Sequence, residues 1–276
     1  MAEHTTSAPF GERRVASTAG GGTALTSTAS FTSFFKGTNH VTLMPRNAAT
    51  AVVIRWALNP YLAVLKTTDA LVAATNLTDA SEAVQDNNTS TTLSMNSFDT
   101  LASGDILYVG ARVPFRGVRV IIGNTNSGSN AALTVKYWKS DGTWATTSVT
   151  DGTSSASKTF AQTGNATWTL PTDWVPTSLR AAGDTVLFAP SILNDPTIYW
   201  TRWETDVVFD STVTVTGMQS MNRSTAYDEF PVDLGYGQPI YRGLGGTGCI
   251  EHLTDAGTAN LIISCGAINT TGRFTD

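Results

Sequence analysis

The chain has 276 residues, of which 41% are hydrophobic and only 14% are charged, with a net charge of −5. Charged residues make up roughly 25% of typical soluble domains, and here Thr, Ser, Ala, Gly and Asn take their place. This composition excludes a disordered chain, and the scattered basic residues exclude nucleic-acid binding through a clustered basic face. A surface with few charged residues suits a protein packed into an assembly, and it equally suits an ordinary secreted β-protein.

The N-terminal residues lack the basic and apolar regions of a secretory signal peptide. No apolar stretch approaches the roughly 18–20 residues needed to cross a bilayer. We therefore expect no association with a membrane, and a protein that is made and kept in a cytosol or released by lysis.

Residues 1–30 are expected to form an extended N-terminal arm. Residues 16–30 are mostly Thr, Ser, Ala and Gly, so this segment has little apolar area to offset its backbone entropy. The arm should be disordered alone or ordered by lying on a partner. Its candidate anchors to a larger particle are Phe10, Arg13 and Arg14.

From residue 31 onward, short runs rich in β-branched or aromatic residues predict β-strands. The first of these are Val41–Met44, Ala51–Leu58 and Tyr61–Lys66. Asp69–Val84 is the one stretch whose spacing permits a helix, although its Thr and Asn residues weaken it. The polar run Gln85–Thr92 marks a boundary.

The middle of the chain predicts a regular series of short strands separated by turns. Asp141-Gly142 lies between two aromatic-bearing runs and tolerates the positive φ angles of a tight hairpin turn. Strands at about 8–12-residue spacing, with little helix, predict a β-sandwich or jelly roll. The predicted strands are Asp105–Gly110, Gly117–Ile122, Leu133–Trp138, Thr143–Val149, Tyr199–Asp206 and Thr212–Gly217.

The last part of the chain returns to β-structure and needs a partner sheet. Its predicted strands are Pro239–Arg242, Gly248–Leu253 and Leu261–Ile268, and the unpaired candidates lie between His40 and Lys66. We therefore expect an all-β fold in which a jelly-roll-like β-sandwich, residues 98–217, is inserted in or followed by a smaller β-domain. The smaller domain, residues 31–97 plus 218–276, would anchor the protein.

The two cysteines fall in a predicted hairpin. A turn centred on Gly257 would place Cys249 opposite Cys265, and Leu253 opposite Leu261. Opposed cysteines at a non-hydrogen-bonded position can form a disulfide, whereas a reducing cytosol favours buried thiols. Both alternatives stay open.

Sequence motifs for catalysis, metal binding or a cofactor are not found, so we expect no enzyme, no metal and no cofactor. Glu251 and His252 are neighbours on a strand, which places them on opposite faces and argues against a catalytic dyad. Loop acids leave two lesser options open. Asp228-Glu229, Asp206 and Asp210 would be the carboxylates of a glycosidase, and Asp141, Asp151 or Asp184 would bind calcium.

An ordered string of motifs covers roughly the middle two-fifths of the chain. It comprises Gly104–Gly110, Pro114–Val118, Val135–Trp138, Thr143-Trp144, Val149–Thr153, Thr167-Trp168, Pro171–Trp174 and Tyr199–Arg202. This order resembles a Trp-rich β-sandwich module that recurs in structural proteins of tailed-phage particles, including capsid-decorating, tail and fibre proteins. The resemblance implies a role in a virion and leaves the position in the particle open.

The strand Tyr199–Glu204 carries the most aromatic residues. Alternation places Tyr199, Thr201 and Trp203 on one face, and Trp200 with Arg202 and Glu204 on the other. A Trp beside Arg and Glu suggests an indole covered by a guanidinium, and an exposed Trp200 with Arg202 would form a glycan-stacking site. The alternative is that the tryptophans mostly pack the core.

Together these features predict a non-enzymatic virion structural protein, most concretely a capsid decoration or cement protein on the outside of the head shell. The expected partners are the major capsid protein and further copies of the chain in a homo-oligomer, most plausibly a trimer. The alternatives are a tail or baseplate component and a glycan-binding adhesin module that contacts a host glycan.

Overall fold

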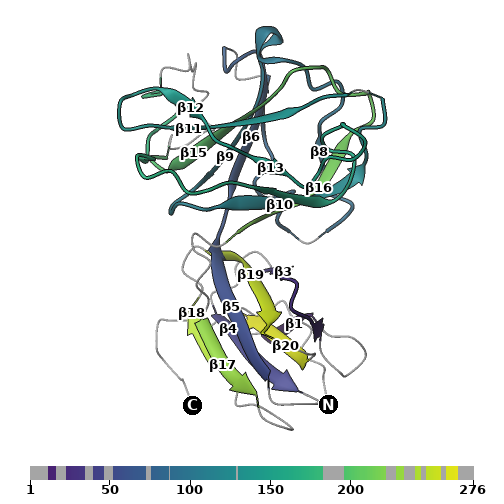
Figure 1. The fold of residues 1–276 in the computed structure, drawn as a ribbon, viewed down its shortest axis with the longest axis vertical. Helices are drawn as coiled ribbons and strands as arrows, with labels where there is room; N and C mark the ends of the chain where they lie inside the picture. Colours follow the sequence, from purple (N-terminus) through teal and green to yellow (C-terminus); the bar gives the residue numbers. More distant parts are fainter. Residues whose placement is uncertain are drawn as a thin grey trace, which may run out of the picture. The chain divides into compact units, whose positions relative to one another are not determined.

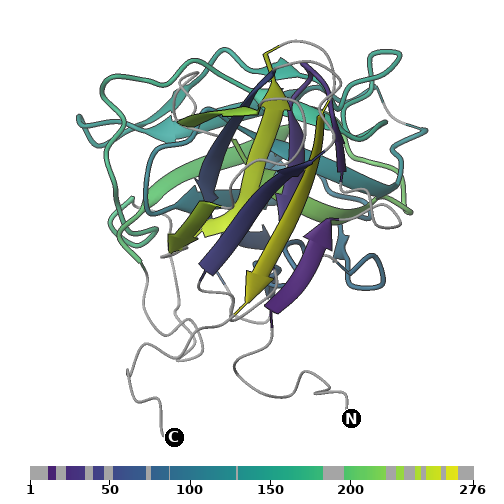
Figure 2. The ribbon, with the colours of Figure 1, turned by 90° about the horizontal axis from the view of Figure 1, so that it is seen from below.

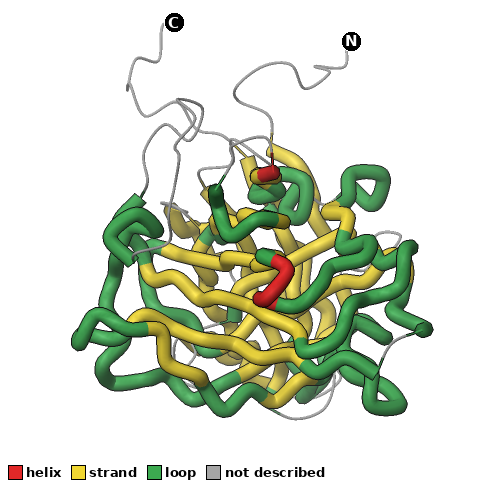
Figure 3. The backbone as a smooth tube through the Cα atoms, turned by 90° about the horizontal axis from the view of Figure 1, so that it is seen from above, coloured by secondary structure: helices red, strands yellow, loops and turns green. Residues whose placement is uncertain are grey.

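The computed structural model describes residues 12–16, 23–34, 40–46, 52–72, 76–86, 88–128, 130–182, 196–221, 228–232, 240–243, 247–255 and 259–266. These residues form antiparallel β-sheets, and none of them is in an α-helix, which confirms the predicted all-β class. The red segments in Figure 3 are short 3-10 turns. The chain divides into two compact units. We name them the end domain, residues 1–59 and 226–276, and the sandwich domain, residues 60–225.

The sandwich domain consists of two sheets (Figure 1). One sheet has six strands in the order β12-β11-β15-β9-β6-β7, and the other has five in the order β13-β14-β10-β16-β8. The strands are β6 (Ala63–Thr68), β7 (Leu77–Asp79), β8 (Leu93–Ser94), β9 (Asp105–Ala111), β10 (Gly117–Asn124), β11 (Leu133–Trp138), β12 (Trp144–Thr146), β13 (Thr150–Asp151), β14 (Gly164–Thr167), β15 (Tyr199–Thr205) and β16 (Thr214–Ser220). A short 3-10 turn, η2 (Leu101–Ser103), precedes β9.

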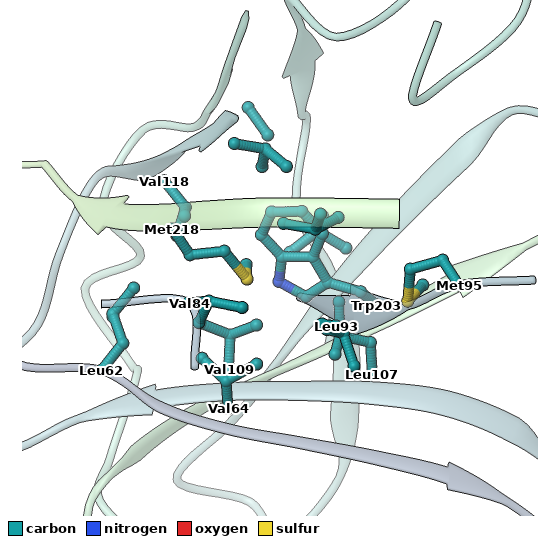
Figure 4. Close-up of a cluster of buried hydrophobic side chains, with 14 of the residues drawn as sticks. Leu62, Val64, Val84, Leu93, Met95, Leu107, Val109, Val118, Trp203 and Met218 are labelled. Atoms are coloured by element: carbon teal, nitrogen blue, oxygen red, sulfur yellow. The ribbon is translucent and has the colours of Figure 1, made fainter. Parts of the chain in front are cut away.

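One cluster of buried apolar side chains fills the space between these sheets (Figure 4). Val109 and Trp203 project into it from the six-stranded sheet, and Val118 and Met218 project from the five-stranded sheet. Because one core joins two sheets face to face, the predicted β-sandwich is confirmed. The finer jelly-roll connectivity stays a prediction.

The hairpin at Asp141-Gly142 has the structure that the sequence predicts. β11 and β12 pair antiparallel with Trp138 opposite Trp144, and Gly142 has φ = 81°. The backbone N–H of Gly142 donates to the carbonyl oxygen of Lys139 at 3.1 Å, which closes the turn. A left-handed residue at this place favours glycine, because a Cβ atom would be strained there.

The helix considered for Asp69–Val84 is wrong. After β6 the chain makes a turn in which Thr67 Oγ1 accepts the backbone N–H of Leu71 at 3.0 Å, and the chain then returns as β7. The domain boundary is also different, since residues 60–97 belong to the sandwich domain. The physical reason is strand pairing, because β6 pairs with β9 along its whole length and β8 pairs with β16.

The end domain contains strands from both ends of the chain (Figure 2). One sheet has the order β1-β20-β4-β18 with β2 also on β20, and the other has the order β17-β5-β19-β3. The strands are β1 (Glu12–Ala16), β2 (Thr23–Leu25), β3 (Ser30–Ser33), β4 (His40–Arg46), β5 (Val52–Pro60), β17 (Asp228–Val232), β18 (Ile240–Gly243), β19 (Thr247–Thr254) and β20 (Ala259–Gly266). The expectation that the last strands pair with strands after His40 is confirmed for β4 and β5.

The predicted N-terminal arm is not a separate element in its described residues. β1 pairs with residues 263–266 of β20, and β2 pairs with residues 259–261 of the same strand. The two short strands therefore act as one interrupted edge strand on β20. Backbone pairing with β20 holds both of these short strands in the sheet.

The predicted cysteine hairpin is wrong. β19 pairs with β3, where Cys249 is opposite Ser33, whereas β20 lies in the other sheet, where Cys265 is opposite Arg13 and Val41. The chain therefore crosses between sheets after Thr254 and does not turn back beside itself. Cys249 is buried, and the turn residue Gly257 lies outside the described residues.

Gly110 is required where β9 passes beneath a tryptophan. A Cβ atom on Gly110 would lie 2.5 Å from Cε3 of Trp200 and 2.8 Å from Cδ1 of Ile198. We predict that Gly110→Ala lowers the free energy of unfolding by about 1–3 kcal/mol, because the indole must shift from its packed position. Urea denaturation measures this loss. Gly128→Ala, where the nearest atom would be 3.3 Å away, is the control and should change stability much less.

His252 makes the stability of the end domain depend on pH. It is 1% exposed, its Nε2 lies 3.0 Å from Thr32 Oγ1, and burial lowers its pKa from 6.5 to about 4. Between pH 6.5 and 4 the imidazole of His252 is protonated in the unfolded chain but neutral in the folded one. Stability is therefore complete above pH 6.5 and falls by on the order of 2–3 kcal/mol as the pH drops to 4.

Hydrogen exchange of β19 peptides, corrected for intrinsic rates, should report this loss of stability between pH 7 and pH 5. His252→Gln keeps a hydrogen-bonding group near Thr32 and removes the titration, so its β19 stability should change less across this range. Equal pH dependence in the variant and the wild type would contradict the assignment to His252.

Candidate functional site

The residues proposed to contact a particle lie at the start of the end domain. Arg13 and Arg14 are in β1, opposite Cys265 and Ser264 of β20. Phe10 lies outside the described residues. The structure therefore brings the two arginines to a sheet edge, since β1 has its pairing partner on one side in the described sheet.

Trp200 is not an exposed glycan platform, and this part of the sequence interpretation is wrong. The predicted alternation is correct, because Trp203 lies in the core between the sheets while Trp200 lies on the opposite face. However, Trp200 is 0% exposed. Its ring lies edge-on to Tyr108, 6.3 Å between centroids, and a second apolar cluster that includes Leu71 and Leu179 covers this face of the sheet.

Arg202 pairs with Glu204 on the outer face of the sheet, as the sequence suggests, but its guanidinium covers Trp144 and not Trp200. Its Cζ lies 5.1 Å from the centroid of the Trp144 ring, and its Nε lies 2.6 Å from Glu204 Oε1. Glu204 Oε2 also accepts a hydrogen bond from Nζ of Lys136 at 2.8 Å. One nearly buried carboxylate thus holds two cations from neighbouring strands, and the guanidinium shields an indole from water.

Trp144 and Trp138 are the half-buried members of the sandwich tryptophans. Their rings meet edge to face at 5.3 Å across the β11–β12 hairpin. Trp168, Trp174, Trp200 and Trp203 are all buried. The expectation that the tryptophans mostly pack the core is therefore confirmed.

The sandwich domain has a cleft of about 420 Å³ beside the paired ends of β13 and β14. β13 and β14 pair through Thr150 with Thr167 and through Asp151 with Ala166. On its other side β14 pairs with β10, and just beyond Thr167 the backbone N–H of Trp168 donates to the carbonyl oxygen of Arg116 at 2.8 Å. The cleft is lined by Arg116, Ser148, Thr150, Thr167, Trp168, Thr169 and Leu170.

The tryptophan that lines this cleft is firmly held. Trp168 is 6% exposed, and its ring contacts Phe115 at 5.6 Å and Trp203 at 6.3 Å, both edge to face. Ser148, Thr150 and Thr169 are exposed beside it. The cleft therefore combines a buried aromatic wall with exposed hydroxyl groups and one guanidinium, a mixture typical of sites for small polar ligands.

The acidic residues considered for catalysis or calcium binding have structural roles in the sandwich domain. Asp206 accepts the backbone N–H of Ala132 at 2.7 Å. Asp141 and Asp151 each accept hydrogen bonds from the threonine two residues later. Asp184 lies outside the described residues, Asp228 and Glu229 lie in β17, and no described group of three His, Cys, Asp or Glu residues is gathered as for a metal ion.

Asp210 joins two loops. Its Oδ2 accepts the backbone N–H of Ser127 at 2.7 Å and of Gly128 at 3.1 Å, and its Oδ1 accepts the hydroxyl of Thr212 at 3.0 Å. Desolvation raises its pKa, but the hydrogen bonds from Ser127 and Thr212 outweigh this effect and lower the pKa to about 2. The carboxylate is therefore ionised at neutral pH and serves as an acceptor, as a loop anchor requires.

Comparison with known proteins identifies no relative. No family model matches the chain, and no curated protein or solved structure matches it either. The resemblance to tailed-phage structural proteins therefore rests on the motifs of the sequence. No helix within the described residues is long and apolar enough to cross a membrane.

The cleft was not predicted from the sequence. The available signal is the alternation Thr167-Trp168-Thr169, in which a core tryptophan is flanked by two hydroxyl side chains. That pattern indicates a strand with one buried and one polar face. It does not indicate that the neighbouring strand departs at Thr150.

On the outer face of the six-stranded sheet, substitution of Glu204 should lower the stability of the sandwich domain. Glu204→Gln removes the carboxylate and leaves Lys136 and Arg202 facing each other, so we predict a loss of about 1–3 kcal/mol in the free energy of unfolding. Asp141→Asn is the control, because its ion pair with Lys139 is exposed and contributes little. Equal small losses in both variants by urea denaturation would contradict the structural role of Glu204.

Proposed function

We propose that this chain is a non-enzymatic structural protein of a tailed-phage particle, and specifically a decoration or cement protein on the outside of the head shell. The observation that carries the proposal is the domain arrangement. The sandwich domain is one continuous segment inserted between β5 and β17 of a domain made from both chain ends. This chain order gives one domain that could anchor the protein and a second domain that could be displayed, as decoration of a shell requires.

The end domain offers strand edges for binding. Among the described strands, β18 and β3 each pair on one side only, as does β17. An edge strand presents unpaired backbone groups that an extended segment of a partner can complete. With 14% charged residues, the chain would bind a shell mainly through backbone pairing and apolar contact.

Arg13 and Arg14 support the same assignment of the end domain. They lie on β1 at the end of the order β1-β20-β4-β18. Arginine is well suited to binding carboxylates of a neighbouring protein. We infer that the partner is the major capsid protein and that a homo-oligomer, most plausibly a trimer, presents several equivalent edges at once.

A binding assay on purified phage shells that lack the protein tests the proposal. The full chain should co-sediment with shells, and labelled protein should be seen on the head by electron microscopy. If the labelled protein were found on the tail or baseplate, the decoration role would be wrong and the chain would be a tail or baseplate component. Failure to bind any part of the particle would overturn the virion proposal.

A matched pair of variants tests the anchoring edge. Arg13→Glu with Arg14→Glu should weaken shell binding at least tenfold, because charge reversal places carboxylates at the contact. Arg112→Glu with Arg180→Glu makes the same charge change at two exposed residues of the sandwich domain and should bind like the wild type. Mass measurement in solution and on the shell distinguishes a trimer from a monomer.

A further inference from the structure

We propose that the cleft beside Trp168 binds a neutral sugar residue of an oligosaccharide, with the indole N–H of Trp168 as a donor to the sugar. This inference concerns the sandwich domain alone and does not depend on attachment to a particle. The site is distinct from the stacking position considered at Trp200, which is fully buried. The argument rests on the indole N–H and on the hydroxyl groups that line the cleft.

The indole of Trp168 carries the polar group that most restricts the choice of ligand. The buried indoles of Trp174 and Trp203 both donate their N–H groups to oxygen atoms of the chain, at 3.2 and 2.9 Å. The N–H of Trp168 donates to no group in the part of the chain that the structure describes, and it is not among the side-chain atoms that are enclosed without a partner. It is therefore open to the cleft that this side chain lines, although the side chain as a whole is only 6% exposed.

A ligand that enters the cleft displaces water from this N–H and must replace the hydrogen bond that water makes. An indole N–H can only donate, so the ligand must offer an oxygen atom as acceptor. A buried donor left without a partner costs about 1–3 kcal/mol. A hydroxyl or ring oxygen of a sugar meets this requirement, whereas an apolar ligand does not.

The hydroxyl groups of the lining fit the same kind of ligand. Ser148, Thr150 and Thr169 are exposed, and their side chains make no hydrogen bond to any described part of the protein. Each hydroxyl can donate one hydrogen bond and accept others. The hydroxyl groups of a sugar have the same two capacities, so ligand and lining can bond in either direction. Leu170, half-buried in the wall, adds apolar contact for the C–H groups of the ring.

The charges near the cleft favour a neutral ligand over an acidic one. Arg116 is the one charged side chain among the seven lining residues, and it already has an interaction within the chain. Asp151 lies next to Thr150 in sequence, but its Oδ1 accepts the backbone N–H of Thr153 at 2.9 Å, which commits this carboxylate to its own turn. An ionised ligand would lose hydration here without a dedicated partner for its charge.

An extended peptide is less well matched than a sugar. A peptide that adds to a sheet pairs with consecutive backbone groups of an edge strand. The edge strand here, β13, comprises only Thr150 and Asp151, and the carbonyl oxygen of Asp151 then accepts the backbone N–H of Ser154 at 3.3 Å in a turn. The volume of about 420 Å³ lies within the range of about 300–1,000 Å³ that small-ligand sites occupy.

An NMR titration of the full chain, with isotope-labelled tryptophan, tests the proposal. The neutral probes are maltotriose, lactose and chitotriose at millimolar concentration, and at least one should shift the indole N–H signal of Trp168. The variant Trp168→Phe assigns that signal by removing it. No shift with any of the three sugars would overturn the proposal. Tenfold tighter binding of a glucuronate-containing oligosaccharide, or an equal shift with the neutral peptide tetra-alanine, would also overturn it.

Two pairs of variants locate the site by isothermal titration calorimetry. Trp168→Phe keeps an aromatic wall and removes the donor, so it should weaken binding about fivefold, whereas Trp138→Phe, outside the cleft, should not. Ser148→Tyr fills the cleft from an exposed position and should abolish binding, whereas Thr146→Tyr, exposed two residues earlier, should not. Circular dichroism confirms that each variant is folded. Wild-type affinity in both folded cleft variants would show that the sugar binds elsewhere and would overturn the proposal.

Discussion

The buried indole of Trp203 can lie between the two sheets of the sandwich domain only because its N–H finds a partner there. Its Nε1 donates to Thr201 Oγ1 at 2.9 Å, and the same hydroxyl donates to the carbonyl oxygen of Val109 at 2.7 Å. An unsatisfied N–H at this depth would offset much of the gain from burying the ring. Thr201 therefore allows a tryptophan side chain to be placed in the core between the two sheets.

The six-stranded sheet is covered on both faces, and this arrangement follows from its tryptophans. Trp203 belongs to the core between the sheets, while Trp200 belongs to a second cluster on the outer face with Tyr108. Every residue of β9 is buried as a result. A sheet enclosed in this way needs few charged residues, which accounts for part of the low charge of the chain. The surface that stays open to ligands is correspondingly limited, and the cleft beside Trp168 lies where the smaller sheet loses its pairing.

Much of the sandwich domain could be predicted because its strands and turns are specified by residues close together in the sequence. The alternation in Tyr199–Glu204 and the turn at Asp141-Gly142 depend on residues next to each other in sequence, and both were predicted correctly. The burial of Trp200 depends on Leu71 and Leu179, which no local pattern connects to it. The hairpin of β19 and β20 was a local expectation that failed, because both strands have partners far away in the sequence. The cleft could not be foreseen, since it depends on where the pairing of Thr150 with Thr167 stops.

A domain built from both chain ends cannot form until its last strands have been synthesised. β1, β2 and β4 all pair with β20, and β5 pairs with β17. The first strands therefore cannot complete their sheets until the later strands have been made. The sandwich domain is a continuous segment and can fold while they wait. A chain cut short after residue 225 would therefore keep a folded sandwich and lack the end domain altogether. The topology thus sets an order of folding during synthesis, because the end domain acquires its surfaces only after β20 has been made.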